Sequence, residues 1–133
     1  MRDLPTYTVE DLEAESSFTI GEFTVDDAAR LGTIGLGVIA ERGLNLAIDI
    51  VVDRHLTFRA MTGTTGSAND EWLEGKAAVA RHYGVPSLLV RRRFEATGGT
   101  IADDGLDATY KAHGGSIPIM VAGVVRGTVT MSG

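Results

Sequence analysis

Residues 110–119 of the chain read Tyr-Lys-Ala-His-Gly-Gly-Ser-Ile-Pro-Ile, and residues 127–133 read Gly-Thr-Val-Thr-Met-Ser-Gly. Apolar residues alternate with others in both stretches, which predicts β-strands because successive side chains of a strand point to opposite faces. The Ala122-Gly123 pair between them predicts a tight hairpin turn. Pro118 has no amide hydrogen to donate, so its strand should lie at a sheet edge or turn that position outward.

Two adjacent glycines stand between a histidine and this hairpin. Glycine adopts backbone conformations that other residues resist, so Gly114 and Gly115 should let the chain bend sharply or approach a ligand closely. At least one of them should have a positive φ. Ile117 and Ile119 should face the core from the strand that follows. His113 would then lie beside exposed backbone amides, so this turn is the first place to look for a site.

The other elements follow from capping residues, periodicity and length. Helices are predicted over residues 8–15, 24–42, 69–83 and, slightly better than a strand, 85–96; strands are predicted over 18–23, 45–53, 56–61, 116–122 and 124–131, with a polar connection over 97–111. Asn69 is expected to cap the helix that it begins. Together these elements predict an α/β (α+β) domain, a mainly antiparallel sheet with packed helices.

The long helix predicted over residues 24–42 has an unusual middle. Its residues 31–40 are apolar nearly all round, which predicts a buried helix. Gly32 and Gly35 each cost about 1 kcal/mol relative to alanine inside a helix. Close contact with a sheet or with another subunit is the expected compensation.

Length and composition exclude several classes of protein. The chain has 133 residues, which predicts a single domain over 1–133. It has no cysteine, so disulfides and thiolate metal sites are excluded. Its net charge of −6 argues against nucleic acid or an anionic membrane as the main partner. No apolar run is long enough for a membrane span and no apolar leader is visible, so we expect a cytoplasmic protein.

Motifs in two parts of the chain resemble the haem-degrading-domain-like (GlcG/HbpS-like) family, in the branch with a His-Gly-Gly-x-x-Pro-Ile motif. The resemblance covers nearly the whole chain. Its matching positions are Asn69, Asp70, Trp72, Lys76, Tyr110, His113, Gly114, Gly115, Pro118, Ile119, Gly127, Ser132 and Gly133.

This resemblance implies a profilin-like fold and higher homo-oligomers. Some similar proteins bind or degrade haem, or take part in glycolate or haem utilisation, so the resemblance makes haem a possible cofactor here. Similar proteins continue past the Ser-Gly with an Asp-His pair and a final helix. This chain stops at Gly133, so the C-terminal helix of the family is expected to be absent.

The candidate ligand-binding residues are Asn69, Trp72, Lys76, Tyr110, His113, Gly114 and Gly115. Trp72 and Lys76 are four residues apart and share a helix face, where a cation beside an indole would suit a carboxylate or propionate. The alternative is a lysine stem that lies along the tryptophan on a capped helix. Arg91-Arg92-Arg93 could hold an anion or a neighbouring subunit's acids, or could form a solvated helix face.

His113 could be an axial haem ligand, a metal ligand or a general base. The alternative is a structural histidine that hydrogen-bonds to the turn. No paired histidine or carboxylate spacing supports a dedicated metal site, and no residue pattern identifies a catalytic group.

Three functions remain open from the sequence, and with them whether the chain is an enzyme. The first is a non-enzymatic, homo-oligomeric binding or assembly module. The second is a haem-binding or haem-degrading protein, with His113 nearest the iron. The third is a sensor of, or an enzyme acting on, a small carboxylate. Its pocket would lie between the helix start at Asn69 and the His113 turn, with Lys76 opposing the anion.

Overall fold

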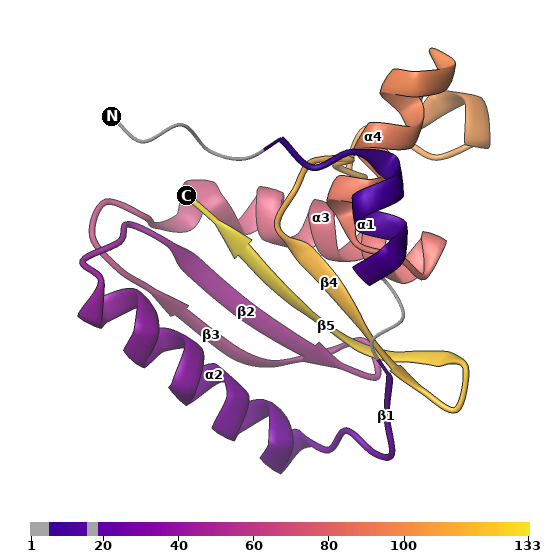
Figure 1. Cartoon of the computed structure of the whole chain (residues 1–133). Coiled ribbons are helices and arrows are strands. Elements are labelled where there is room, and N and C mark those ends of the chain that lie inside the picture. Colours follow the sequence, from indigo (N-terminus) through magenta and orange to yellow (C-terminus); the bar gives the residue numbers. More distant parts are fainter. Residues whose placement is uncertain (1–5, 16–18) are drawn as a thin grey trace.

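A five-stranded sheet with the strand order β1-β4-β5-β2-β3 organises the protein (Figure 1). The computed structural model describes residues 6–15 and 19–133. The strands are β1 (Thr19–Ile20), β2 (Ala47–Val52), β3 (His55–Met61), β4 (Ser116–Val121) and β5 (Val124–Ser132). β1 is parallel to β4, and the other neighbouring pairs are antiparallel. The predicted fold class is therefore confirmed.

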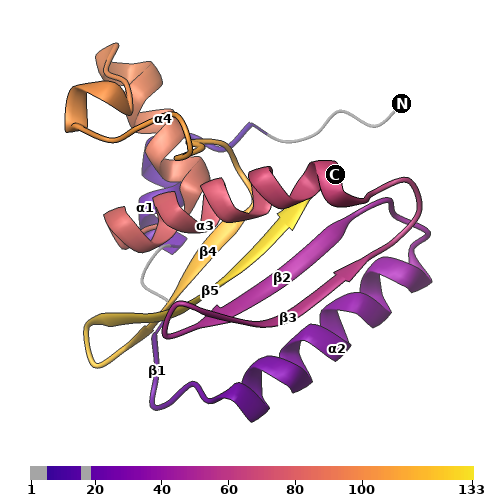
Figure 2. The same cartoon turned by 180° about the vertical axis from the view of Figure 1, so that it is seen from behind.

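Helices cover both faces of the sheet. They are α1 (Val9–Glu15), α2 (Val25–Glu41), α3 (Asp70–Tyr83) and α4 (Ser87–Thr97), with short 3₁₀ turns at Ser67–Asn69 and Ala102–Asp104. α2 packs on β2 and β3, whereas α3 packs on β4 and β5 from the other side (Figures 1 and 2). α1 and α4 pack against each other. No helix among residues 6–15 and 19–133 is long and apolar enough to cross a membrane.

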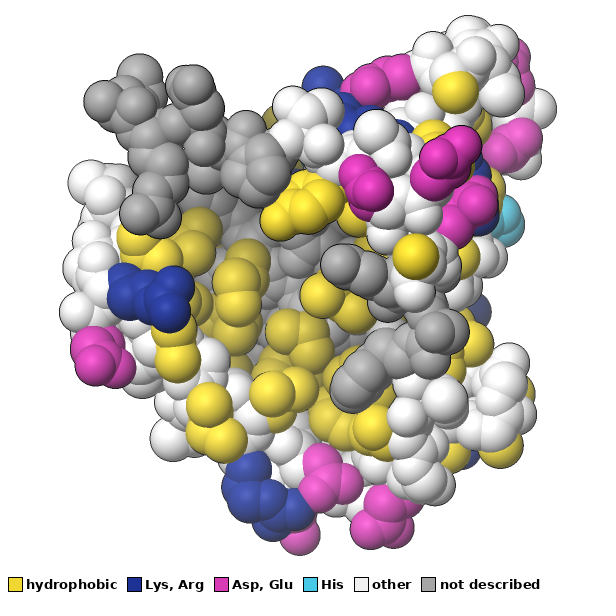
Figure 3. Space-filling model, viewed as in Figure 1, with side chains coloured by type: hydrophobic (Ala, Val, Ile, Leu, Met, Phe, Trp, Pro, Cys, Tyr) yellow, Lys and Arg dark blue, Asp and Glu magenta, His cyan; other side chains and the backbone are white. Residues whose placement is uncertain are grey.

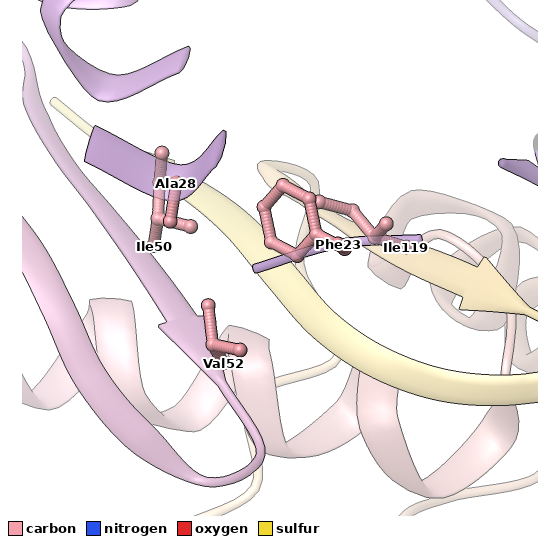
Figure 4. Close-up of a cluster of buried hydrophobic side chains, with 5 residues drawn as sticks. All are labelled: Phe23, Ala28, Ile50, Val52 and Ile119. Carbon is pink, nitrogen blue, oxygen red and sulfur yellow. The ribbon is translucent and has the colours of Figure 1, made fainter. Parts of the chain in front are cut away.

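The core on the α2 side forms where the start of that helix meets the sheet. Phe23, Ala28, Ile50, Val52 and Ile119 are buried together there (Figure 4). Thr24 begins α2 with a capping box, in which the Asp27 amide donates to the Thr24 hydroxyl and the Thr24 amide donates to the Asp27 carboxylate. These two bonds satisfy amides that a helix leaves unpaired at its start. The predicted start of the long helix is confirmed.

The predicted turns and most of the element boundaries are confirmed. Ala122 and Gly123 both have positive φ, at 51° and 77°, as a tight hairpin turn requires. β1 pairs only with Met120 and Val121, so β4 is an edge strand at Pro118. Residues 85–96 contain a helix, α4, rather than a strand. The short strand predicted over 18–23 is confirmed only at Thr19–Ile20, and Phe18 lies outside the described residues.

α2 is not buried all round, and this prediction was wrong. Gly32 and Gly35 face the sheet, where a Cβ on Gly32 would overlap the Phe58 ring and a Cβ on Gly35 would lie 2.8 Å from Ile48 Cδ1. The predicted close contact with a sheet is confirmed at these glycines. The flank of the helix beside these glycines leaves three large apolar side chains open: Leu31 is 38% exposed, Ile34 64% and Val38 42%.

Candidate functional site

The His-Gly-Gly turn passes very close to the end of β5. Gly115 has φ 137°, so the prediction of a positive φ is confirmed. Its carbonyl accepts a hydrogen bond from the Met131 amide at 2.8 Å. A Cβ on Gly115 would overlap the Met131 carbonyl oxygen and lie 3.1 Å from Lys76 Nζ. The turn therefore needs glycine at 115 both for its backbone angles and for space.

Lys76 is a buried structural cation rather than the free cation that was one of the two interpretations of its sequence position. Its side chain is on the inner face of α3, and Nζ donates to the Met131 carbonyl at 3.1 Å. Burial lowers the pKa of this amine from its usual value. The cation over the Trp72 ring is Lys111 instead, with Nζ 5.2 Å from the ring centroid. Lys111 also pairs with the exposed carboxylate of Glu71 at 3.3 Å.

His113 lies against Trp72 and accepts a hydrogen bond from Arg91. The two rings meet edge to face with centroids 5.2 Å apart. Arg91 contacts Nδ1 of His113. A guanidinium has no acceptor, so Nδ1 accepts and the imidazole hydrogen lies on Nε2. Burial, followed by the charges of Arg91, Lys76 and Lys111, lowers the pKa of His113, which favours this neutral form.

We call Trp72, Arg91, Lys111 and His113 the basic cluster. It joins three segments that are far apart in the sequence. Gly75 on α3 explains how they meet, because its carbonyl accepts from the Lys111 amide at 3.1 Å and a Cβ there would lie 2.5 Å from the Thr109 carbonyl oxygen. Arg91 comes from α4, where it also pairs with the half-exposed Glu95 at 3.0 Å. The structure thus combines two basic side chains, a neutral imidazole and an indole.

Other predicted site residues lie outside the basic cluster. The Tyr110 ring is 6.1 Å from the ring of His82, near the far end of α3. Asn69 is the N-cap residue of α3, as predicted, but its side chain makes no capping hydrogen bond to this helix. Its carbonyl oxygen accepts from the Gly66 amide at 3.0 Å, and its amide group donates to Ser132 at 3.1 Å. Asn69 therefore ties the start of α3 to the end of β5. Gly114 has the Leu88 side chain as the nearest neighbour of its Cβ position, at 3.3 Å.

Sequence reasoning missed Lys111 and named Arg91 only as one of three basic residues. One signal pointed to Lys111, because the chain has only two lysines and this one stands two residues before His113. The position of Arg91 depends on how α4 packs, which no local pattern reveals. Within the described ranges, no group of three or more histidine, aspartate or glutamate side chains is arranged to hold a metal ion.

A second feature, on the α2 face of the sheet, is an apolar groove of about 750 Å³. Tyr7 and Leu12 border it on one side and Leu31 on the other, while Ile117 and Met131 are on its floor. Figure 3 shows hydrophobic side chains gathered in this hollow between α1 and α2. Ile119 is buried as predicted, but Ile117 is 52% exposed, so its predicted core position was wrong.

A buried ion pair lies beneath α3, between β2 and β3. Asp49 is 1% exposed, and its carboxylate accepts from Arg59 at 2.9 Å. Arg59 also reaches Asp70 at 3.1 Å. Burial raises the pKa of Asp49, although the Arg59 charge opposes the shift. This pair is separate from the basic cluster and joins β2, β3 and the start of α3.

Sequence comparisons place these features among known proteins. The family model of the HbpS-like haem-degrading proteins matches residues 23–133. A UPF0303 protein of Streptomyces coelicolor is 42% identical over 130 residues, which cover 95% of this chain and 82% of that protein. A UPF0303 protein of Rhizobium etli is 33% identical over 123 residues, which cover 91% and 75% of the two chains.

Solved structures share the same fold. The crystal structure of the Ybr137w protein is 26% identical with a TM-score of 0.83, and the match covers 96% of this chain and 78% of that one. The crystal structure of HbpS is 15% identical with a TM-score of 0.68, and the match covers 86% and 79%. The likeness to HbpS shows the fold alone.

Proposed function

Because the chain belongs to the HbpS-like family of haem-degrading proteins, we propose that it is a homo-oligomeric binding module that assembles through α2. The observation that carries the proposal is the exposed apolar stripe of Leu31, Ile34 and Val38. These positions share one face of the helix, and Leu31 also borders the apolar groove, so stripe and groove are continuous. Burying such a patch against a second copy would remove apolar surface from water.

An acidic substitution in this stripe should dissociate the assembly. Ile34→Glu places a charge where the contact needs an apolar surface, and burying an unpaired charge is costly. We expect light scattering and analytical ultracentrifugation to show an oligomer for the unaltered chain and a monomer for this variant.

Thr33→Glu is the matched control, because it adds the same charge on the same helix but away from the stripe. It should remain oligomeric. A chain that is monomeric at all concentrations tested, or equal dissociation by both variants, would exclude assembly through this stripe.

A second candidate function is the binding of a small carboxylate at the basic cluster. The specific observation is that Arg91 and Lys111 flank His113 while their acidic partners, Glu95 and Glu71, are at least half exposed. Exposed ion pairs contribute little, so a ligand carboxylate can replace these partners. Nε2 of His113 carries the imidazole hydrogen and would donate to it, and Trp72 would cover one side.

The arrangement of His113 favours this role over iron ligation. A histidine that binds iron through Nε2 carries its hydrogen on Nδ1, which could no longer accept from Arg91. Haem binding through His113 would therefore require Arg91 to leave. A haem propionate that contacts Arg91 and Lys111 would not require Arg91 to leave.

A cytoplasmic location of the protein stays a prediction from the sequence.

Arg91→Gln should weaken propionate binding at least roughly tenfold, since a hydrogen bond to a charged group is worth about 1.5–3 kcal/mol. Calorimetric titration with propionate measures the loss.

Arg93→Gln is the control, since Arg93 belongs to the same run but pairs with Glu13 at 3.1 Å. Equal affinities of the two variants would contradict binding at the basic cluster. A Soret band that forms with haem and is lost in His113→Ala would support iron ligation instead.

A further inference from the structure

A polar cavity lies at the other end of α3 from Trp72. It has a volume of about 460 Å³ and is lined by Asp53, Arg54, Arg81, Arg126 and Thr128, with valines of β2 and β5 around them. The β2–β3 turn and the β4–β5 hairpin lie side by side at this end of the sheet, near the last turn of α3 (Figure 2). The cavity therefore draws on three separate parts of the chain.

The cavity concentrates positive charge in an acidic protein. Three of its side chains are arginines and one is an aspartate, while the whole chain has a net charge of −6. Arg126 pairs with Asp53 at 3.2 Å. In the described part of the chain, Arg54 and Arg81 form no ion pair. Two guanidinium groups at this cavity are thus available to an anion.

Thr128 supplies an independent sign of a ligand. The residue is 1% exposed and lines the cavity, yet its hydroxyl has no hydrogen-bond partner among the described residues. The next hydroxyls on the same face of β5 do have partners, because Thr130 bonds to Ser116 at 2.8 Å and Ser132 to Asn69 at 3.1 Å. A buried polar group without a partner destabilises the fold, so a ligand that bonds to this hydroxyl would remove that cost.

Arg54 occupies a backbone position that suits glycine better. It has φ 68° and Asp53 has φ 47°, so the two-residue turn between β2 and β3 has positive φ at both positions. Such turns favour Asn-Gly or Asp-Gly. An arginine in this conformation is strained, because its Cβ crowds the backbone. A role for its side chain in the cavity accounts for that strain.

We propose that this cavity binds a small oxyanion with two negative charges. Arg54, Arg81 and Arg126 provide planar guanidinium donors that match oxyanion geometry, and the Thr128 hydroxyl donates from the wall. Phosphate and a short dicarboxylate share this chemistry. The Asp53 carboxylate repels the anion and forms an ion pair with Arg126, so it lowers the affinity of the cavity for the anion.

Calorimetric titration of the full chain with inorganic phosphate and with succinate tests the site and shows which of the two anions it binds. Arg81→Gln should weaken binding at least roughly tenfold, as expected for losing a hydrogen bond to a charged group. Arg54→Gly should also weaken binding but raise the unfolding temperature, because glycine relieves the turn. A merely structural role for Arg54 would not give this opposite pair of effects.

Asp53→Asn should tighten binding roughly two- to fivefold, since it frees Arg126 and removes a repulsive charge. Asparagine tolerates the positive φ of this position, so the variant should fold. Arg42→Gln removes a positive charge at the C-terminal end of α2, outside the cavity, and should leave binding unchanged. Binding of neither anion, or equal binding by wild type, Arg81→Gln and Arg54→Gly, would overturn the proposal.

Discussion

Gly115→Ala should destabilise the protein by about 2 kcal/mol or more. At φ 137° the backbone of residue 115 is in a region that side chains rarely adopt, and such strain costs about 1–3 kcal/mol. The new Cβ would also overlap the Met131 carbonyl oxygen, which accepts from the buried Lys76 amine. Both effects act on one junction between β4, β5 and α3. Urea unfolding followed by circular dichroism measures the change.

Gly114→Ala is the neighbouring control. The nearest atoms to its Cβ position belong to the Leu88 side chain at 3.3 Å, which can shift slightly, so this variant should lose much less stability. Equal losses at both positions would show that the turn has no special requirement at 115. The glycine would then need a different explanation, such as close approach of a ligand.

Gly75→Ala should also destabilise the protein, although alanine is the better helix former by about 1 kcal/mol. The Cβ would lie 2.5 Å from the Thr109 carbonyl oxygen and overlap the Lys111 side chain. Segment 109–111 would have to move away from α3, and its hydrogen bond from the Lys111 amide to the Gly75 carbonyl would lengthen or break. We expect a net loss of about 1–3 kcal/mol, the usual range for overpacking.

The same substitution should loosen the basic cluster, because Lys111 would no longer lie over Trp72. Trp72 fluorescence and propionate affinity report this change. Gly37→Ala in α2 is the control, since nothing lies within 4 Å of its Cβ position. It should stabilise the protein by about 0.5–1 kcal/mol. A Gly75→Ala variant that is as stable as Gly37→Ala would contradict the close packing of segment 109–111 on α3.

Most of the fold could be predicted because its signals are local. The start of α2 at Thr24, the alternation in β2 and the positive φ of Gly115 each depend on residues near one another in sequence. The prediction for α2 failed at its outer face. The apolar sequence of α2 shows that more than one side of the helix is apolar. It does not show how many of those sides are buried by the rest of the same chain.

The candidate site was predictable only in part. His113 and Trp72 were both selected, and the structure places their rings in contact. Helical spacing assigned the cation to Lys76, whereas Lys111 lies over the indole. Helical spacing identifies neighbours on one helix face. It gives no information on Lys111, which lies thirty-five residues after Lys76 in the sequence and contacts the helix from a separate segment.

The sequence by itself determined most of the elements, the hairpin between β4 and β5, the family and the need for glycine in the turn before β4. Each of these depends on backbone angles, side-chain periodicity or a motif that a short segment carries. Only the tertiary structure decided that Lys76 is buried, that Arg91 meets His113 and that Arg54, Arg81 and Arg126 share a cavity. Those outcomes depend on how α3 and α4 pack. Packing determines which side chains that are distant in sequence come together, and how strongly their charges are desolvated.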